Sequence, residues 1–143
     1  MNPKDEPDRE YDVVAHAVIG AAIEVHRHLG PGYLESVYQN AMQVELTARS
    51  ITFEQKKTVE VFYKGQPVGE GEIDLFVGGL LVVELKAVEA LAPIHKAQII
   101  SYLKAMRRPL GLLINFKVPL LHQGVERVVL SQVNRQDPEW GKT

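Results

Sequence analysis

The sequence predicts a mixed α/β fold in which helices flank a mixed β-sheet. Two segments with apolar residues at helical spacing come first, and three segments rich in β-formers follow them. A third helical segment then separates these strands from a continuous apolar run at 110–116. A helical crossover lets that run pair in parallel with the preceding strand. We therefore expect one α/β (α+β) domain with the element order α-α-β-β-β-α-β-β.

Proline and glycine set the predicted helix ends. The first helix spans about 11–29 and stops at Gly30-Pro31, and the second runs from Gly32 to about Arg49. Pro93 suits the first position of a third helix, which ends before Pro109. The predicted strands are 58–63, 69–77, 80–87, 110–116 and 127–130.

We expect residues 10–132 to form the single domain, between a disordered leader at 1–9 and a polar tail at 133–143. A chain of 143 residues is long enough to bury most of its apolar surface. It has no cysteine, which excludes disulfides, thiolate metal sites and cysteine nucleophiles and fits a reducing cytoplasm. No apolar run approaches the roughly 18 residues that span a bilayer, so we expect no membrane partner.

The most informative segment combines charge with a buried strand pattern. Glu84 and Lys86 lie two residues apart within an apolar strand and therefore project from one face. Asp74 precedes them on the neighbouring strand of a hairpin. Burying such charges is costly unless they pair or bind a metal. A divalent cation beside a phosphate and a plain Asp/Glu–Lys salt bridge are the two alternatives.

Hairpin register tests the metal site, because directly opposite residues share a face only when their numbers have an even sum. A two-residue Gly78-Gly79 turn would separate the acids. A three-residue loop at 77–79, with its last glycine left-handed, brings them together. Asp74 would then face Val82, and Glu72 would face Glu84.

Such a group of carboxylates repels itself unless a cation intervenes. Oxygen ligands suit Mg²⁺ or Mn²⁺, which activates water and neutralises developing phosphate charge. Lys86 would orient the water or hold a phosphate oxygen.

Two helices offer further candidates. Glu35 and Tyr38 lie one turn apart on the second helix, and Gln98 and Tyr102 lie at i,i+4 on the third. The structural alternatives are a first-turn acid for Glu35, a core residue for Tyr38 and a solvated side chain for Gln98.

A basic stretch follows the predicted carboxylate site. No acid occurs from Ala90 to Val125, and cations there could bind phosphate, although helix-end cations would serve the helix dipole equally well. These cations are Lys96, Lys104, Arg107, Arg108 and Lys117. The net charge of −2 argues against a general nucleic-acid coating protein.

The motifs together carry a resemblance. Gly32-x-x-Glu35-x-x-Tyr38 is similar to the signature of the GxxExxY family within the PD-(D/E)XK nuclease-like superfamily. The resemblance extends from about Tyr11 to Leu130. It continues through the segments 71–75, 83–87, 95–103 and 111–116.

This resemblance implies a restriction-endonuclease-like αβββαβ core with an extra N-terminal helix. It assigns Asp74, Glu84 and the Leu85 backbone carbonyl as metal ligands, and Lys86 as the catalytic lysine. Glu35 would be the first-helix acid and Gln98 the glutamine beside the site. One position departs from the pattern, since Ile73 stands where many relatives have proline before Asp74.

The expected function is Mg²⁺- or Mn²⁺-dependent hydrolysis of phosphodiester bonds in nucleic acid, with DNA favoured over RNA. The alternatives are a catalytically inert nucleic-acid-binding module and a structural subunit that keeps the fold. A homodimer through residues 110–116 and the first helix is a further expectation.

Overall fold

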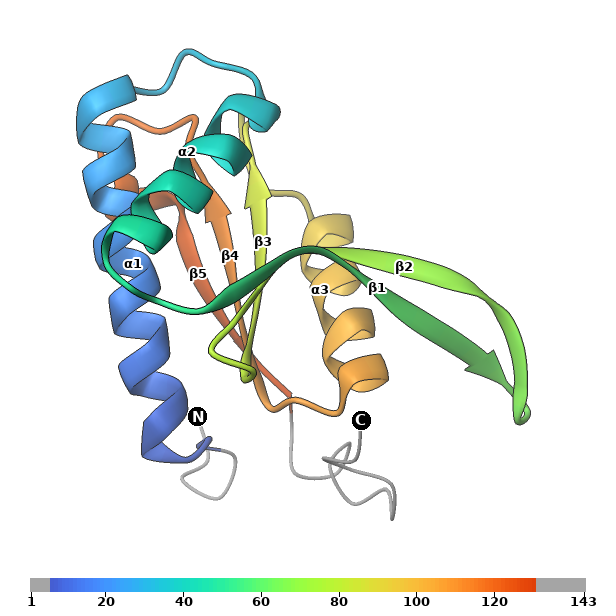
Figure 1. The fold of residues 1–143 in the computed structure, drawn as a ribbon. Coiled ribbons are helices and arrows are strands. Elements are labelled where there is room, and N and C mark those ends of the chain that lie inside the picture. Colours follow the sequence, from blue (N-terminus) through green and yellow to red (C-terminus); the bar gives the residue numbers. More distant parts are fainter. Residues whose placement is uncertain (1–5, 131–143) are drawn as a thin grey trace.

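The computed structural model describes residues 6–130, and Figure 1 shows their arrangement. The helices are α1 (Arg9–Leu29), α2 (Glu35–Ala48) and α3 (Pro93–Met106), with a short 3-10 helix η2 (Leu121–Gly124). The strands are β1 (Phe53–Tyr63), β2 (Gln66–Val77), β3 (Leu81–Lys86), β4 (Leu110–Asn115) and β5 (Val125–Val129). This order confirms the predicted succession of elements.

The five strands form one mixed sheet in the order β1-β2-β3-β4-β5. Only β3 and β4 are parallel, with Glu84 paired to Leu113 and Lys86 to Asn115. The other neighbours are antiparallel. The parallel pair follows from α3, which carries the chain back across the sheet between the two strands.

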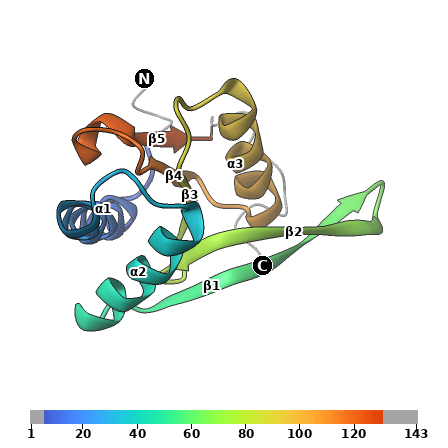
Figure 2. The same ribbon diagram turned by 90° about the horizontal axis from the view of Figure 1, so that it is seen from above.

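Helices cover both faces of the sheet. Figure 2, viewed along the sheet from above, shows α1 and α2 on one face and α3 on the other. Alternating strand residues therefore divide between two cores. Val83 and Leu85 pack in the core with α1 and α2, whereas Val82 packs in the core with α3. On the same strand, Glu84 and Lys86 consequently belong to the α3 face.

The turn from β2 to β3 keeps the even register that the sequence predicts. It lies at 78–80 rather than at 77–79, because Val77 pairs with Leu81. Both Gly78 and Gly79 are left-handed, with φ of +63° and +68°. Two successive left-handed residues suit glycine alone, which explains the Gly-Gly pair.

Beyond the sheet body, β1 and β2 continue as a two-stranded arm that projects away from the helices (Figures 1 and 2). Its pairs run out to Tyr63 and Gln66 at the tip. β1 begins at Phe53 rather than at the predicted Thr58, because residues 54–57 are polar and lack the alternation of a half-buried strand. The arm is therefore longer than the sequence indicates.

Two helix ends also differ from expectation. α2 begins at Glu35 rather than Gly32, because the loop before it is tied down by a side chain. The Tyr38 hydroxyl donates to the Gly30 carbonyl at 2.5 Å and accepts the Tyr33 N–H at 3.1 Å. Near the N-terminus, α1 begins at Arg9 rather than at about Tyr11. Glu6, which precedes it, forms an ion pair with Arg127 at 3.2 Å. The predicted tail at 133–143 and residues 1–5 lie outside the described residues.

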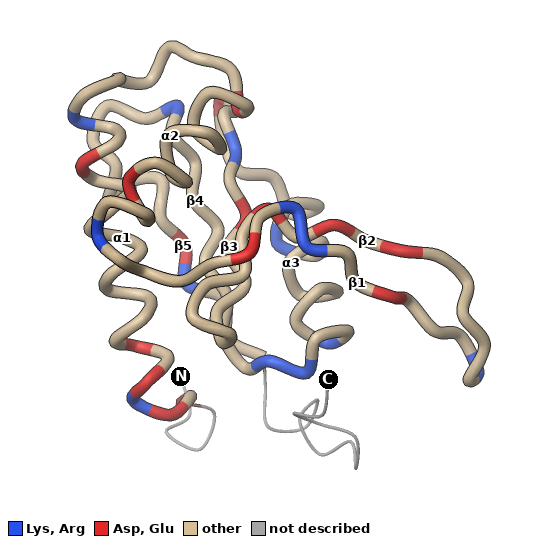
Figure 3. Tube along the Cα trace, in the orientation of Figure 1, with Lys and Arg blue, Asp and Glu red and all other residues tan. Residues whose placement is uncertain are grey.

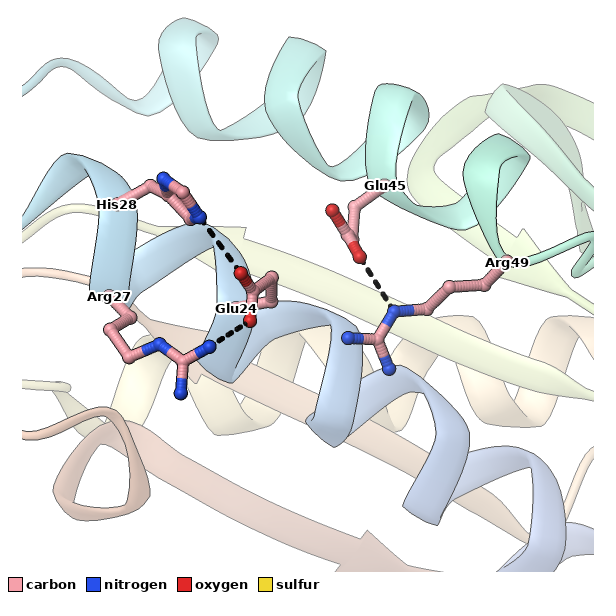
Figure 4. A network of polar contacts seen from close by, with 5 residues as sticks. All are labelled: Glu24, Arg27, His28, Glu45 and Arg49. Carbon is pink, nitrogen blue, oxygen red and sulfur yellow. Dashed lines mark hydrogen bonds and ion pairs between the residues drawn. The ribbon is translucent and has the colours of Figure 1, made fainter.

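Several polar contacts on the outer surface of α1 and α2 stay within one helix, whereas Asp12 of α1 pairs with Arg127 of β5 at 2.8 Å. Glu24 bonds to Arg27 and His28, and Glu45 bonds to Arg49 at 2.7 Å (Figure 4). Such exposed i,i+3 and i,i+4 pairs contribute only a few tenths of a kcal/mol each. The apolar core, rather than these pairs, holds the two helices on the sheet.

The continuous apolar run at 110–116 is explained by this core. β4 lies between β3 and β5, and all six of its residues are buried. It therefore offers no surface for the dimer that the sequence suggested at this segment. Within 6–130, no helix has both the length and the hydropathy needed to cross a membrane.

Gly124 provides a test of the packing around β4. It ends η2, and a Cβ placed there would clash with the carbonyl oxygen of Asn115. We expect Gly124→Ala to lower the free energy of unfolding by about 3 kcal/mol, measured by urea denaturation. Gly32→Ala is the matched control, because nothing lies within 4 Å of its Cβ position, and it should change stability by less than about 0.5 kcal/mol. Equal effects would contradict the described packing of η2 on Asn115.

Candidate active site

The candidate site lies where β2 and β3 stop pairing. The backbone ladder between them covers 75–77 and 81–83 and then ends. Continuing this register places Asp74 opposite Glu84, not opposite Val82 as the sequence predicted. The even register that brings the two acids together is confirmed, and the exact partners are corrected by two residues.

The two carboxylates take over from the backbone at this point. The Leu85 N–H donates to Asp74 Oδ2 at 2.7 Å, and the Asp74 N–H donates to Glu84 Oε2 at 3.1 Å. The carboxyl groups of Asp74 and Glu84 also share a hydrogen bond. N–H and C=O of one strand residue point the same way, so the Leu85 carbonyl is also directed toward β2. The strands therefore open around three oxygen-bearing groups.

β1 deforms opposite the same point. Gln55 pairs with Leu75 and Lys57 with Ile73, and Lys56 lies between them in the left-handed region at φ +48°. A lysine in this conformation is unusual and marks local strain. β2 changes face here too, because Ile73 and Phe76 both pack in the core with α3. The kink directs the arm away from β3 and leaves Asp74 at the opening.

Glu84 is the most deeply buried acid at the site, with only 3% of its surface exposed. Burial and the adjacent Asp74 together raise the pKa of its carboxyl to about 9, and burial is the larger cause. Without a cation, the proton that Glu84 retains relieves its repulsion with Asp74. A metal ion would replace that proton.

α2 brings two residues to Asp74 from the other layer. The buried Gln39 side chain donates to the Asp74 backbone carbonyl at 2.9 Å and holds β2 in place at this kink. Glu35 lies one helical turn earlier and lines the same cavity of about 320 Å³ together with Gln39, Lys56 and Asp74. Burial raises the pKa of Glu35, and the neighbouring Asp74 adds to this shift. Glu35 therefore lies in the first turn of α2 and also lines the cavity beside Asp74.

α3 supplies the groups beside Lys86. The Lys86 ammonium donates to Gln98 Oε1 at 3.2 Å, and Gln98 Nε2 donates to the Tyr102 hydroxyl at 3.4 Å. Tyr102 packs against β2, where a Cβ on Gly71 would be 2.6 Å from its ring. This close approach explains why glycine precedes the acids of β2. The structure thus joins Lys86, Gln98 and Tyr102 in one row.

The sequence did not predict two residues that support the site. Gln39 is the first, although its i,i+4 spacing from Glu35 places it on the same helix face. Asn115 is 2% exposed, accepts the Val88 N–H at 3.0 Å and donates to the Val88 carbonyl at 2.8 Å. It holds the chain as it leaves β3 after Lys86. A lone amide at the end of an apolar strand was its only sequence signal.

Other predicted residues take different places. Tyr38 is fully buried, stacks on Phe116 at 4.4 Å between ring centroids, and is a core residue, as its structural alternative stated. Glu72 is exposed and pairs with Thr58 rather than facing Glu84, because of the register correction. It still lines the cavity beside Asp74.

The predicted basic residues do not form one face. Lys96 pairs with Glu126 at 3.7 Å and Lys117 with Glu89 at 2.8 Å, so acids outside the basic stretch compensate both. Arg108 lies over the Phe76 ring at 5.6 Å. Lys104 and Arg107 remain near the C-terminal end of α3, where Figure 3 shows a basic segment.

The donor set fits a hard divalent cation. Across 6–130 there is no cluster of three or more Asp, Glu, His or Cys side chains with metal-binding geometry. Two carboxylates and a backbone carbonyl, completed by water, are instead the sparse oxygen set that Mg²⁺ accepts. The proton that Glu84 retains beside Asp74 marks the position where positive charge is favoured.

The raised pKa of Glu84 gives a pH prediction for the metal-free protein. Because the folded pKa lies above the ordinary value of 4.5, the folded state holds the extra proton between about 4.5 and about 9. Stability should therefore be highest at the acidic end and fall as pH rises toward about 9. Glu84→Gln should remove this slope and melt at a higher temperature near the alkaline end, measured by thermal unfolding in chelator. An unchanged slope in the variant would contradict the buried, protonated state of Glu84.

Comparison with known proteins agrees with this geometry. A family model described as the PD-(D/E)XK nuclease superfamily matches residues 12–128, which include all the site residues above. Neither the curated proteins nor the solved structures yield a match. The five-stranded mixed sheet with helices is consistent with a restriction-endonuclease-like fold. The chain belongs to the PD-(D/E)XK nuclease superfamily.

Proposed function

We propose that this protein hydrolyses phosphodiester bonds of nucleic acid with Mg²⁺ or Mn²⁺, and that DNA is its preferred substrate over RNA. One observation carries the proposal. Asp74 and Glu84 meet at the opening between β2 and β3, and Lys86 lies beside them on the α3 face of β3. Membership of a nuclease superfamily supports the same reaction type.

The acids and a carbonyl would hold the ion. Asp74, Glu84 and the Leu85 carbonyl are the ligands in this proposal, and water completes the shell. A bound divalent ion makes water a better nucleophile and neutralises charge on the phosphate. Gln39 keeps the Asp74 backbone in place through its bond to the Asp74 carbonyl.

Lys86 is the catalytic residue of the proposal. Its bond to Gln98 aims the ammonium along α3 rather than at the carboxylates. Placed there, the ammonium can hold a phosphate oxygen or orient a water near the scissile bond. Gln98, steadied by Tyr102, acts through Lys86 and is a positioning residue. Glu35 provides an acceptor oxygen in the cavity that Asp74 also lines.

We further propose that the chain is of the GxxExxY type. The structure gives a physical reason for each side chain in that signature. Tyr38 locks the loop before α2 through the Gly30 carbonyl and the Tyr33 N–H. With the loop fixed, Glu35 enters the cavity from the first turn of α2. The motif therefore supports one wall of the site.

Cleavage is the direct test. Single- and double-stranded DNA and RNA should be incubated with Mg²⁺ or Mn²⁺, with products resolved on denaturing gels. We expect Lys86→Ala to reduce cleavage by about 100-fold or more, because the positioned ammonium is lost. The matched control is Lys96→Ala, whose side chain pairs with Glu126 and which should keep activity. If no substrate is cut but nucleic acid is bound, the catalytically inert module replaces the enzyme.

Metal binding can be tested without cleavage. We expect Mn²⁺ at about one hundred times its Kd to stabilise the wild-type protein by about 2.7 kcal/mol, seen as a higher melting temperature. Asp74→Asn keeps an acceptor for the Leu85 N–H but should lose this response. Glu72→Gln, on the same cavity but outside the ligand set, should retain it. Equal responses in all three proteins would exclude Asp74 as a ligand.

A further inference from the structure

A groove separates the projecting arm from α3. It has a volume of about 400 Å³ and lies away from the carboxylates. Arm residues Glu60, Val61 and Phe62 form one wall, and Ser101, Lys104 and Arg107 form the other. None of these residues has a role in the proposed reaction.

Helix α3 connects the groove to the candidate site, because residues of this one helix contact Lys86 and line the groove. Gln98 contacts Lys86, Ser101 and Tyr102 lie one turn later, and Lys104 follows them on α3. A chain of phosphates leaving Lys86 can therefore follow the exposed side of α3 into the groove.

The charges in the groove suit such a polyanion. Lys104 is exposed, and no carboxylate within 6–130 pairs with it. Arg107 continues the basic segment at the end of α3 that Figure 3 shows. Glu60 on the arm is the one opposing charge among the lining residues. The lining therefore includes two basic residues and one acid.

The arm adds an exposed aromatic ring. The strand register shifts here, because Val61 pairs with Gly69 and Phe62 with Pro67, which leaves Val68 of β2 as the extra residue. Val61 and Phe62 both line the groove. Phe62 is 58% exposed, which is a large apolar surface to leave in water. Tyr63 follows it, does not line the groove, and lies against the Lys64 ammonium.

We propose that this groove binds a single-stranded segment of nucleic acid that extends from the active site. Lys104 and Arg107 contact its phosphates, and Phe62 stacks on an unpaired base. A cationic track combined with an aromatic platform is the usual means of holding single strands. A base inside a duplex cannot stack on Phe62, so the substrate has an unpaired end or is single-stranded. This inference rests on the proposed function for the identity of its ligand.

Binding in chelator separates this inference from catalysis, because no metal is then present. Fluorescence anisotropy with a labelled oligonucleotide should show tighter binding of the single strand than of the matched blunt duplex. Phe62→Ala should weaken single-strand binding at least about fivefold, whereas Tyr63→Ala should leave it unchanged. Lys104→Ala should weaken it and reduce the salt-dependence slope by about 0.7, the value for one phosphate contact. Lys96→Ala, on the same helix but paired with Glu126, is its control.

Glu60→Gln tests the same groove in the opposite direction. Removing the opposing charge should tighten single-strand binding, a gain that damage to the fold would not produce. The inference is overturned if Phe62→Ala matches Tyr63→Ala, if Lys104→Ala matches Lys96→Ala, or if a blunt duplex binds as well as the single strand. If the wild-type protein still cleaves nucleic acid in that case, the proposed function stands and only the groove inference is rejected. If the protein neither cleaves nor binds nucleic acid, both proposals are rejected.

Discussion

The separation of β2 from β3 on the N-terminal side of Leu75 is the constraint on which the site depends. From Leu75 to Val77 the strands pair through their backbones, and before Leu75 the Asp74 and Glu84 carboxylates accept the N–H groups instead. Unpaired strand groups inside a protein are costly, so this substitution keeps the opening stable. The same side chains that complete the hydrogen bonding of the sheet are therefore the ones offered to a cation.

The buried acid pair costs stability in the absence of a cation but leaves the carboxylates available to bind one. Glu84 is buried, and the high pKa of its carboxyl shows that its charge is disfavoured without a counter-charge. Lys86 is two residues away, yet its ammonium bonds to Gln98 and not to the acids. A simple Glu84–Lys86 or Asp74–Lys86 salt bridge, the structural alternative at the sequence level, is absent among the described ion pairs. The charge of the acids is left for another partner, which favours a cation site over an internal ion pair.

Much of this site could be predicted from the sequence because strand periodicity is strict. Alternation places Glu84 and Lys86 on one face, and a hairpin register with an even sum of residue numbers places Asp74 on the same face. The exact register could not be predicted, because two adjacent glycines permit loops that begin at different residues. The left-handed conformation of Lys56 could not be predicted either, because it depends on how β1 crosses the kink in β2. Gln39 and Asn115 act on backbone groups of distant segments, and such contacts leave little pattern in the chain.

The kink at Lys56 and Asp74 also links the site to the arm. By turning β1 and β2 away from β3, it opens the cavity beside Asp74 and sends the remaining strand length outward along α3. A two-stranded ribbon is marginal by itself, and this one gains support where Val59 and Ile73 pack in the core with α3. One local deformation thus accounts for both the opening at the carboxylates and the groove near Phe62. A substitution that straightened β1, such as a β-branched residue forced into the left-handed position of Lys56, would affect the two together.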